Sequence, residues 1–256
     1  MSPTWNRALV TGASSGIGKA IAEQLAAAGT ELVVVARDTE RLESLAAALP
    51  VTVEILTADL GDPEAVGTVA ARLSDHHIPI DLLVNNAGLG FAGPTLDTPD
   101  EQDALTVAVN VVALHRLCRA AGQAMRQRGA GGILNVSSIA GDMPGPQSAT
   151  YNATKAFVTS FSEALHVQLK RDGVTVTALC PGLTHTEFQE RAAGVGDLQA
   201  PGFAWQSADE VAAVGLDAVA KGKAVAVSGA VNQAVSGLLR TLPRRVTREI
   251  VARARA

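Results

Sequence analysis

The segment Ala8-Leu-Val-Thr-Gly-Ala-Ser-Ser-Gly-Ile-Gly18 joins an apolar run to an amphipathic helical pattern. Residues 8–11 are typical of a buried strand, and residues 16–28 are typical of a helix that ends at Gly29. Glycines in the turn allow positive φ and the close approach of a pyrophosphate, and the start of the helix offers free N–H groups. Between a strand and a helix, this turn predicts a dinucleotide site. A glycine-rich turn needed only for packing is the alternative.

The same alternation of apolar runs and helical patterns continues along the chain. Predicted strands cover residues 8–11, 32–35, 51–57, 80–84, 132–136, 174–179 and 224–227. Predicted helices cover residues 16–28, 38–49, 63–74, 100–128 and 151–170, and Asp38 caps the second of them. We therefore expect an α/β, doubly wound Rossmann fold, with a parallel sheet of about seven strands and helices on both faces. No linker or repeat divides the chain, which predicts one domain over residues 1–256.

The composition argues against several classes of function. The chain has 256 residues, 47% hydrophobic and 18% charged, enough for one large core or two smaller ones. Aromatic residues make up 3%, which argues against stacking platforms for nucleic acid. The net charge of −4 gives no overall attraction to DNA or anionic lipid. We expect no nucleic-acid partner.

Cysteine and histidine placement gives no signal for a disulfide or a metal site. Cys118 and Cys180 lie far apart in the sequence, and the 5 histidines form no ligand motif. The N-terminal residues lack an apolar signal core, and no run approaches membrane-spanning length. The expectation is a cytoplasmic protein without a metal.

A second informative segment contains Ser138, Tyr151 and Lys155. Tyr151 and Lys155 are four residues apart, so they share one face of a helix. A free tyrosine titrates near pH ~10, and a fixed ammonium close to it favours the phenolate and lowers that pKa. Ser138 follows the strand at 132–136, where its hydroxyl can hold a carbonyl oxygen while Tyr151 protonates it. The alternative is an ordinary surface pair on an amphipathic helix.

Several separated motifs together resemble the short-chain dehydrogenase/reductase family, over roughly residues 5–228. The matching motifs, in order, are the glycine turn 11–18, Asp59-Leu60, the run 85–88, Asn110, Ser138, Tyr151 with Lys155, and Pro181-Gly182. The resemblance implies hydride transfer between a nicotinamide and a carbonyl/alcohol pair. Tyr151 would be the general acid/base, Lys155 would lower its pKa and bind the nicotinamide ribose, and Ser138 would orient the carbonyl. Asn110 would hold a water that connects Lys155 to solvent, and a buried amide that satisfies backbone groups is compatible with that role.

The resemblance also implies where the cofactor lies. The implied contacts are Gly12, Ser14, Ser15, Gly16, Ile17, Gly18, Asp59, Leu60, Asn86, Ala87, Gly88, Tyr151, Lys155, Pro181, Gly182, Thr184 and Thr186. Asp59 would accept from the adenine amino group, and an ordinary helix N-cap is its alternative. Asn85 is expected to tie neighbouring strands together.

The end of the second predicted strand points to NADP(H). An NAD site places an acid there to bind the ribose hydroxyls, but this chain has Ala36 followed by Arg37. The guanidinium of Arg37 can pair with the 2′-phosphate, and the Ser14 hydroxyl can donate a hydrogen bond to the same phosphate. In the alternative, Arg37 is solvated and Asp38 serves the ribose of NAD.

The substrate site is less specified by the sequence. Ser138, Met143, Tyr151 and Phe188 are its expected contacts, with residues 187–206 as a lid that also brings Phe203 and Trp205 to an apolar wall. This favours a neutral, apolar ketone or aldehyde of small to medium size. Packing in the core is the alternative role for these side chains. A non-catalytic dinucleotide sensor and an isomerase, epimerase or dehydratase of the same fold are alternative functions.

Residues 232–256 depart from the family pattern. They carry six arginines (240, 244, 245, 248, 253 and 255) against the single Glu249, a net charge of +5. With their apolar positions they predict a basic amphipathic helical extension. It would pack on its own domain or dimer, or contact a membrane surface. We expect a homodimer or homotetramer.

Overall fold

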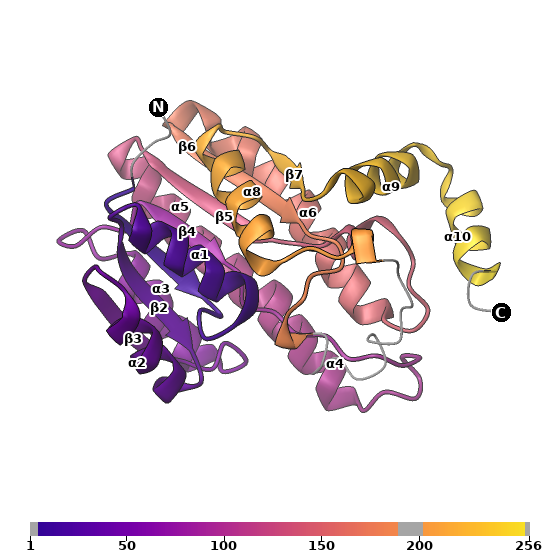
Figure 1. The fold of residues 1–256 in the computed structure, drawn as a ribbon, viewed down its shortest axis with the longest axis horizontal. Coiled ribbons are helices and arrows are strands. Elements are labelled where there is room, and N and C mark those ends of the chain that lie inside the picture. The colour runs from indigo at the N-terminus through magenta and orange to yellow at the C-terminus, as the bar shows by residue number, and fades with distance from the viewer. Residues whose placement is uncertain (1–4, 189–201, 254–256) are drawn as a thin grey trace.

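The computed structural model describes residues 5–188 and 202–253. In these residues a 7-stranded, fully parallel sheet has the strand order β3-β2-β1-β4-β5-β6-β7 (Figure 1). The strands are β1 Arg7–Thr11, β2 Glu31–Ala36, β3 Val53–Thr57, β4 Leu82–Asn85, β5 Gly131–Val136, β6 Val174–Cys180 and β7 Val225–Val227. The predicted doubly wound Rossmann fold is confirmed.

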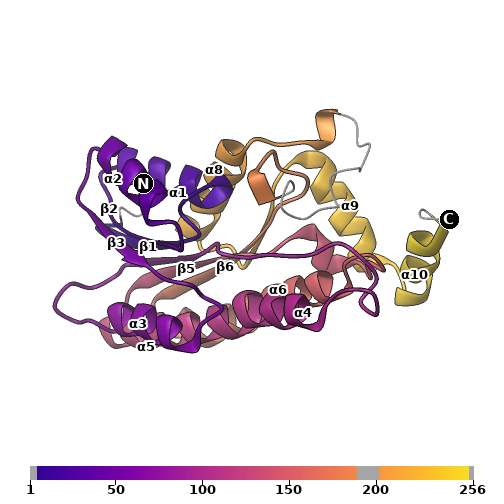
Figure 2. The same ribbon diagram turned by 90° about the horizontal axis from the view of Figure 1, so that it is seen from below.

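Helices cover both faces of this sheet (Figure 2). On one face lie α1 Gly16–Ala27, α2 Thr39–Ala48 and α8 Ala208–Ala220. On the other lie α3 Pro63–Leu73, α4 Asp100–Val107, the π-helical turn η1 Ala108–Ala113, α5 Leu114–Arg128 and α6 Ala149–Leu169. The order of the strands reverses between β1 and β4, and ligands of such sheets bind beyond the strand ends at this switch point.

Two apolar cores follow from the two-residue period of the strands. In β1 and β2, Leu9, Val33 and Val35 pack in one core, while Val10 and Val34 pack in the other. All five side chains are fully buried. Burial on both faces explains why these strands are continuous β-branched and aliphatic runs rather than alternating ones.

Helix ends obey the capping signals in the sequence. The Asp38 carboxylate accepts from the backbone N–H of Arg41 at 3.1 Å and begins α2, as predicted. Asp62 caps α3, which begins with Pro63. Gly129 ends α5 in the left-handed conformation at φ +70°.

The helix predicted over residues 100–128 is interrupted. The chain stays helical from Asp100 to Arg128, but η1 widens it by a π turn in the middle. The expectation that no run approaches membrane-spanning length is wrong, because by length and composition this helix could cross a membrane; 44% of its apolar window is buried inside the fold. It therefore serves as a core helix.

The C-terminal residues form two further helices, α9 Ala230–Thr241 and α10 Arg244–Arg253. Both lie at one end of the molecule, outside the helix layers that cover the sheet (Figure 1). The Ser236 hydroxyl donates to the Asp142 carboxylate at 2.6 Å, and Arg240 Nε contacts the same carboxylate at 3.0 Å. These contacts join α9 to the short 3-10 helix η2 Ile139–Asp142.

Candidate active site

Tyr151 and Lys155 lie in the first two turns of α6, beside the end of β5. The ammonium of Lys155 is 5.6 Å from the centre of the Tyr151 ring. It also donates a hydrogen bond to the Val136 carbonyl at 2.9 Å, and the residue is 5% exposed. The spacing of four residues thus brings both side chains together, as the sequence predicted.

Ser138 follows β5 and begins η2. Its hydroxyl accepts from the N–H of Ala140 at 3.1 Å and donates to the Pro181 carbonyl at 3.4 Å. The Ile139 N–H donates to the same carbonyl at 3.0 Å. Strand β5, its following loop and the end of β6 are therefore joined at the position where Ser138 lies.

Burial dominates the titration of the two α6 side chains. It raises the pKa of Tyr151 to about 12, and a hydrogen bond with Ser138 opposes this rise. Burial also lowers the pKa of Lys155 to about 8, while the Cys180 thiol opposes the fall. The lowering of the Tyr151 pKa expected from Lys155 is not seen in this structure, where burial raises that pKa and the Lys155 ammonium donates to the Val136 carbonyl. The phenol therefore holds its proton at neutral pH.

Asn110 lies in the π turn η1 and is 1% exposed. Its amide accepts from Leu89 N–H at 3.0 Å and donates to the Leu89 carbonyl at 2.8 Å and to the Thr154 hydroxyl at 3.0 Å. A Cβ on Gly88 would lie 3.2 Å from the Asn110 amide oxygen and 3.3 Å from Lys155 Nζ. The side chain thus satisfies backbone groups, as one of its two expected roles required, and it ties the loop after β4 to α6.

The glycine turn adopts the conformation that its sequence predicts. Gly12 and Gly16 have φ of +64° and +54°. A Cβ on Gly12 would lie 2.8 Å from the Asn86 amide nitrogen, and one on Gly18 would clash with Asn86 and with the Gly12 carbonyl. Only glycine therefore fits the turn in this form.

The N-terminus of α1 is open to an anion. Ser15 is its N-cap residue but makes no side-chain capping bond, and the first turn contains no acidic residue. A Cβ on Gly16 would lie 3.0 Å from Thr186 Cγ2, which places the segment after β6 against the turn. Ile17 packs partly into the core below, so its side chain anchors the helix.

Thr11, which the sequence reasoning did not single out, organises the switch point. Its hydroxyl accepts from the N–H groups of Asn86 and Ala87, both at 3.0 Å, and donates to the Val84 carbonyl at 3.3 Å. The Asn86 amide in turn donates to the carbonyls of Thr11 and Gly12 at 3.0 and 3.2 Å. The signal for this role was the polar Thr11 directly after the apolar residues 8–10 of β1.

Asn85 ties strands together, as predicted. Its amide donates to the Asn135 side chain at 2.9 Å, and Asn135 donates to the Ser162 hydroxyl at 2.9 Å. All three are buried. The network connects β4, β5 and α6 directly below the level of Ser138 and Tyr151.

The predicted adenosine end lies at the ends of β2 and β3. Arg37 is exposed, and its guanidinium is 3.9 Å from the Asp59 carboxylate. Asp59 accepts from the Gly61 N–H at 2.9 Å, whereas the N-cap of α3 is Asp62, so the helix-cap alternative for Asp59 is wrong. Leu60 is buried in the core beside them.

In the segment after β6, the residues predicted to bind the cofactor also make contacts within the protein. Thr184 is 5% exposed and donates to the Gly182 carbonyl at 3.1 Å. Gly182 packs against the Asn232 side chain, where a Cβ would clash. Thr186 is the member of this predicted set that borders the glycine turn.

The expected substrate contacts separate in space. The rings of Phe188 and Tyr151 are 5.7 Å apart, and a Cβ on Gly90 would lie 2.6 Å from Tyr151 Cδ2. Met143 lines a pocket to which neither Ser138 nor Tyr151 contributes. Trp205 stacks on His185 at 4.7 Å. The Phe203 side chain and residues 189–201 of the predicted lid lie outside the described residues.

No cluster of three or more His, Cys, Asp or Glu side chains suited to a metal occurs in residues 5–188 and 202–253. Cys118 and Cys180 are both free and buried. The candidate active site contains the Ser138 hydroxyl, the Tyr151 phenol, the Lys155 ammonium and the Asn110 amide.

Comparison with known proteins identifies relatives over most of the chain. The sequence model for short chain dehydrogenases matches residues 6–194. The probable oxidoreductase EphD of Mycobacterium tuberculosis (strain ATCC 25618 / H37Rv) is 36% identical over 252 residues, 91% of this chain and 43% of that protein. The chain thus spans less than half the length of this relative. Sulfoacetaldehyde reductase of Chromohalobacter salexigens is 41% identical over 183 residues, 70% of this chain and 72% of that protein.

Solved structures agree with the sequence relatives. A short-chain dehydrogenase from Sphingobium yanoikuyae in complex with NADPH superposes with a TM-score of 0.81 at 35% identity, covering 93% of this chain and 96% of that one. Fold, ordered motifs and sequence relatives agree, and the chain belongs to the short-chain dehydrogenase/reductase family.

Proposed function

We propose that this oxidoreductase is NADP(H)-dependent and interconverts a ketone or aldehyde and an alcohol, with Tyr151 as the general acid/base. The observation that carries the proposal is the half-buried Tyr151 phenol, with a pKa raised to about 12, whose ring centre lies 5.6 Å from the Lys155 ammonium. A protonated phenol held beside a hydroxyl suits proton transfer to a carbonyl oxygen. That the related sulfoacetaldehyde reductase is named for an aldehyde supports this reaction class.

The residues at the switch point fit a dinucleotide. The positive φ of Gly12 and Gly16 and the uncapped N-terminus of α1 would receive the pyrophosphate, with Ser14, Ser15 and Thr186 around it. Asn86, Ala87 and Gly88 would line the path towards the nicotinamide. When bound, the cofactor supplies or accepts the hydride.

A 2′-phosphate has a basic partner at the end of β2. Arg37 is 64% exposed there, directly after Ala36, and Asp38 is used as the cap of α2. The alternative in which Asp38 serves an NAD ribose has less support, because that carboxylate already accepts from Arg41 N–H. The NADPH complex of the Sphingobium relative supports the same choice.

The polar residues divide the remaining tasks. Ser138 would hold the substrate oxygen, and Tyr151 would give it a proton during reduction or take one during oxidation. Lys155, with a pKa lowered to about 8, would bind the nicotinamide ribose and exchange protons near neutral pH. Asn110 would hold the loop after β4 in place and bind the water through which Lys155 reaches solvent.

The substrate is proposed to be neutral and apolar. Phe188 packs beside Tyr151 and offers an aromatic surface at the reacting group. Leu89 and Phe91 follow β4 on the same edge of the sheet and are partly buried. A screen of uncharged ketones, aldehydes and alcohols, monitored by nicotinamide absorbance with each cofactor, tests the proposal. Absence of net cofactor oxidation with every carbonyl would favour the sensor or isomerase alternatives.

We also propose that the protein is a cytoplasmic homodimer or homotetramer. Exposed apolar side chains lie on α4, η1 and α6, which cover the same face of the sheet: Val107, Val112, Phe157 and Val167. Contact between these helices of two copies would bury them. Light scattering of the purified protein measures the assembly, and a monomer at micromolar concentration would contradict it.

A further inference from the structure

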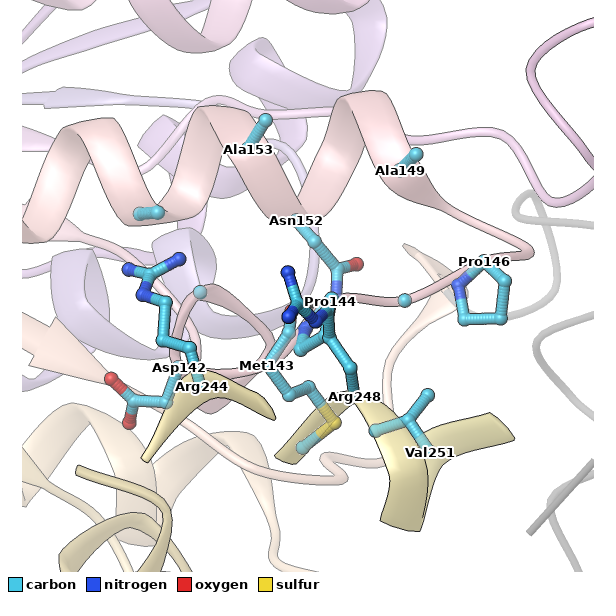
Figure 3. Close-up of a pocket in the computed structure, with 13 residues that line it drawn as sticks. Asp142, Met143, Pro144, Pro146, Ala149, Asn152, Ala153, Arg244, Arg248 and Val251 are labelled. Atoms are coloured by element: carbon cyan, nitrogen blue, oxygen red, sulfur yellow. Dashed lines mark hydrogen bonds between the residues drawn. The ribbon is translucent and has the colours of Figure 1, made fainter. Parts of the chain in front are cut away.

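A pocket of about 490 Å³ lies between α6, the loop after η2 and α10 (Figure 3), and its volume is within the roughly 300–1,000 Å³ of small-molecule sites. On α6, Ala149, Ala153 and Ala156 line it, at the spacing of one helix face. Tyr151 and Lys155 project from the opposite face of the same helix, because they lie about half a turn away from this alanine row. The pocket is therefore separate from the candidate active site.

Most of the pocket wall is apolar. Met143 and Pro144 come from the loop, the alanines come from α6, and Val251 comes from α10. Figure 3 shows the Met143 side chain extending towards α10, so that the loop and the helix enclose the same space. This wall suits a hydrocarbon chain.

One side of the pocket is basic. Arg244 and Arg248 are one turn apart on α10, and both line the pocket and are exposed. Neither forms an ion pair with any residue of the described chain. The one acidic lining residue, Asp142, is already bound by Arg240 and Ser236. Two positive charges that have no ion-pair partner in the described residues therefore lie beside an apolar wall.

We propose that this pocket binds an amphipathic anion, an alkyl or acyl chain that carries one anionic head group. The chain would lie on Met143, Ala149, Ala153 and Val251, and the head group would lie between Arg244 and Arg248. Both arginines are exposed, so the head group keeps part of its hydration and the apolar wall supplies much of the affinity. The ligand would join α10 to α6 without contacting the candidate catalytic residues.

Isothermal titration of the full chain with decanoate, below its micelle concentration, tests the proposal. One-to-one binding is expected, and acetate and decyltrimethylammonium should each bind at least about tenfold more weakly, because each lacks one half of the recognition. Equal binding of the cationic and anionic amphiphiles would overturn the assignment. Binding to phosphatidylglycerol vesicles without binding of free decanoate would also overturn it, in favour of a membrane contact.

Variants locate the site. Arg244→Gln with Arg248→Gln should weaken decanoate binding by about fivefold or more. Arg245→Gln is the matched control, because Arg245 lies on the same helix but pairs with Glu249 at 3.4 Å, and it should change the Kd less than about twofold. Ala153→Phe should reduce decanoate binding, because the larger side chain fills the space beside the apolar wall. The melting temperature of this variant should match that of the wild type. Decanoate affinity that is unchanged in both the arginine double variant and Ala153→Phe would show that the ligand binds elsewhere.

Discussion

Arg41 and Glu187 form an ion pair that joins the first turn of α2 to the segment after β6. Nη1 of Arg41 is 2.8 and 3.0 Å from the two carboxylate oxygens of Glu187. Arg41 lies in the first turn of α2, four residues after Arg37, and Glu187 directly follows Thr186 at the glycine turn. A 2′-phosphate near Arg37 would thus be a second anion within reach of the same α2 turn.

Glu187→Gln should tighten the binding of NADPH by about two- to fivefold and leave NADH nearly unchanged. The substitution removes the anion that competes with the 2′-phosphate for Arg41, and exposed ion pairs have strengths of this order. Fluorescence titration of both cofactors measures the two Kd values. Asp217→Asn, which breaks the comparable exposed pair with Lys221 on α8, is the control. An equal decrease in the Kd for NADH would show that Arg41 does not contact the 2′-phosphate.

Tyr151→Phe should lower kcat by at least about 10²-fold, the usual contribution of a positioned proton donor. The Kd for NADPH should change little, because the ring and its packing against Phe188 remain. Steady-state rates on the best carbonyl substrate and a separate cofactor titration distinguish the two effects. A Phe variant that turns over at near the wild-type rate would disprove the catalytic assignment.

Stability should rise with pH over the window set by Lys155. The pKa of Lys155 is about 8 in the folded protein, against the ordinary lysine value of 10.5 that applies to the unfolded chain. Between these two pH values the unfolded chain therefore binds more protons than the folded protein. The free energy of unfolding therefore increases as pH rises through this window. Tyr151 acts in the opposite sense above pH 10, because its folded pKa is raised to about 12. Urea unfolding of wild type and Lys155→Met from pH 7 to pH ~10 measures the effect. A wild-type curve that stays parallel to that of the variant would contradict the assigned pKa.

The buried amide network below the site should contribute to stability rather than to chemistry. Ser162→Ala removes the acceptor of Asn135 and should lower the free energy of unfolding by about 1–3 kcal/mol, the cost of a buried unsatisfied donor. Ser160, exposed two residues earlier on α6, gives the matched control Ser160→Ala, which should cost less than about 0.5 kcal/mol. Equal effects of the two substitutions in urea would contradict the role of the network.

The sequence predicted the features that depend on local pattern. Continuous aliphatic runs such as Val33 to Val35 identified the central strands, and the glycines at 12, 16 and 18 identified the turn, because each requirement is met within a few neighbouring residues. The spacing of Tyr151 and Lys155 likewise fixes a common helix face.

Features that depend on distant packing were not predicted. Asn110, in the π turn, hydrogen-bonds to Leu89 and Thr154, which are far away in sequence. The raised pKa of Tyr151 reflects burial by the whole fold, whereas the sequence shows only the neighbouring ammonium. Met143 was expected beside the substrate, but the loop directs it towards α10, whose position no local pattern specifies.

The proposed cofactor preference can be reversed at the end of β2. Ala36→Asp with Arg37→Leu should shift kcat/KM from NADPH towards NADH by about 10²-fold or more, since an acid there accepts from the ribose hydroxyls and repels the 2′-phosphate. Arg37 is exposed and its contact with Asp59 is 3.9 Å, so the exchange should leave the fold intact. Arg245→Leu is the control, because Arg245 is an exposed arginine far from the end of β2 in the sequence. Arg72 would not serve, because its side chain is largely buried and bound to Glu54. The measurement is the ratio of kcat/KM for the two cofactors in wild type, the double variant and the control. A wild-type ratio of NADPH to NADH below one would refute the assignment, because Arg37 would then give no advantage to a 2′-phosphate.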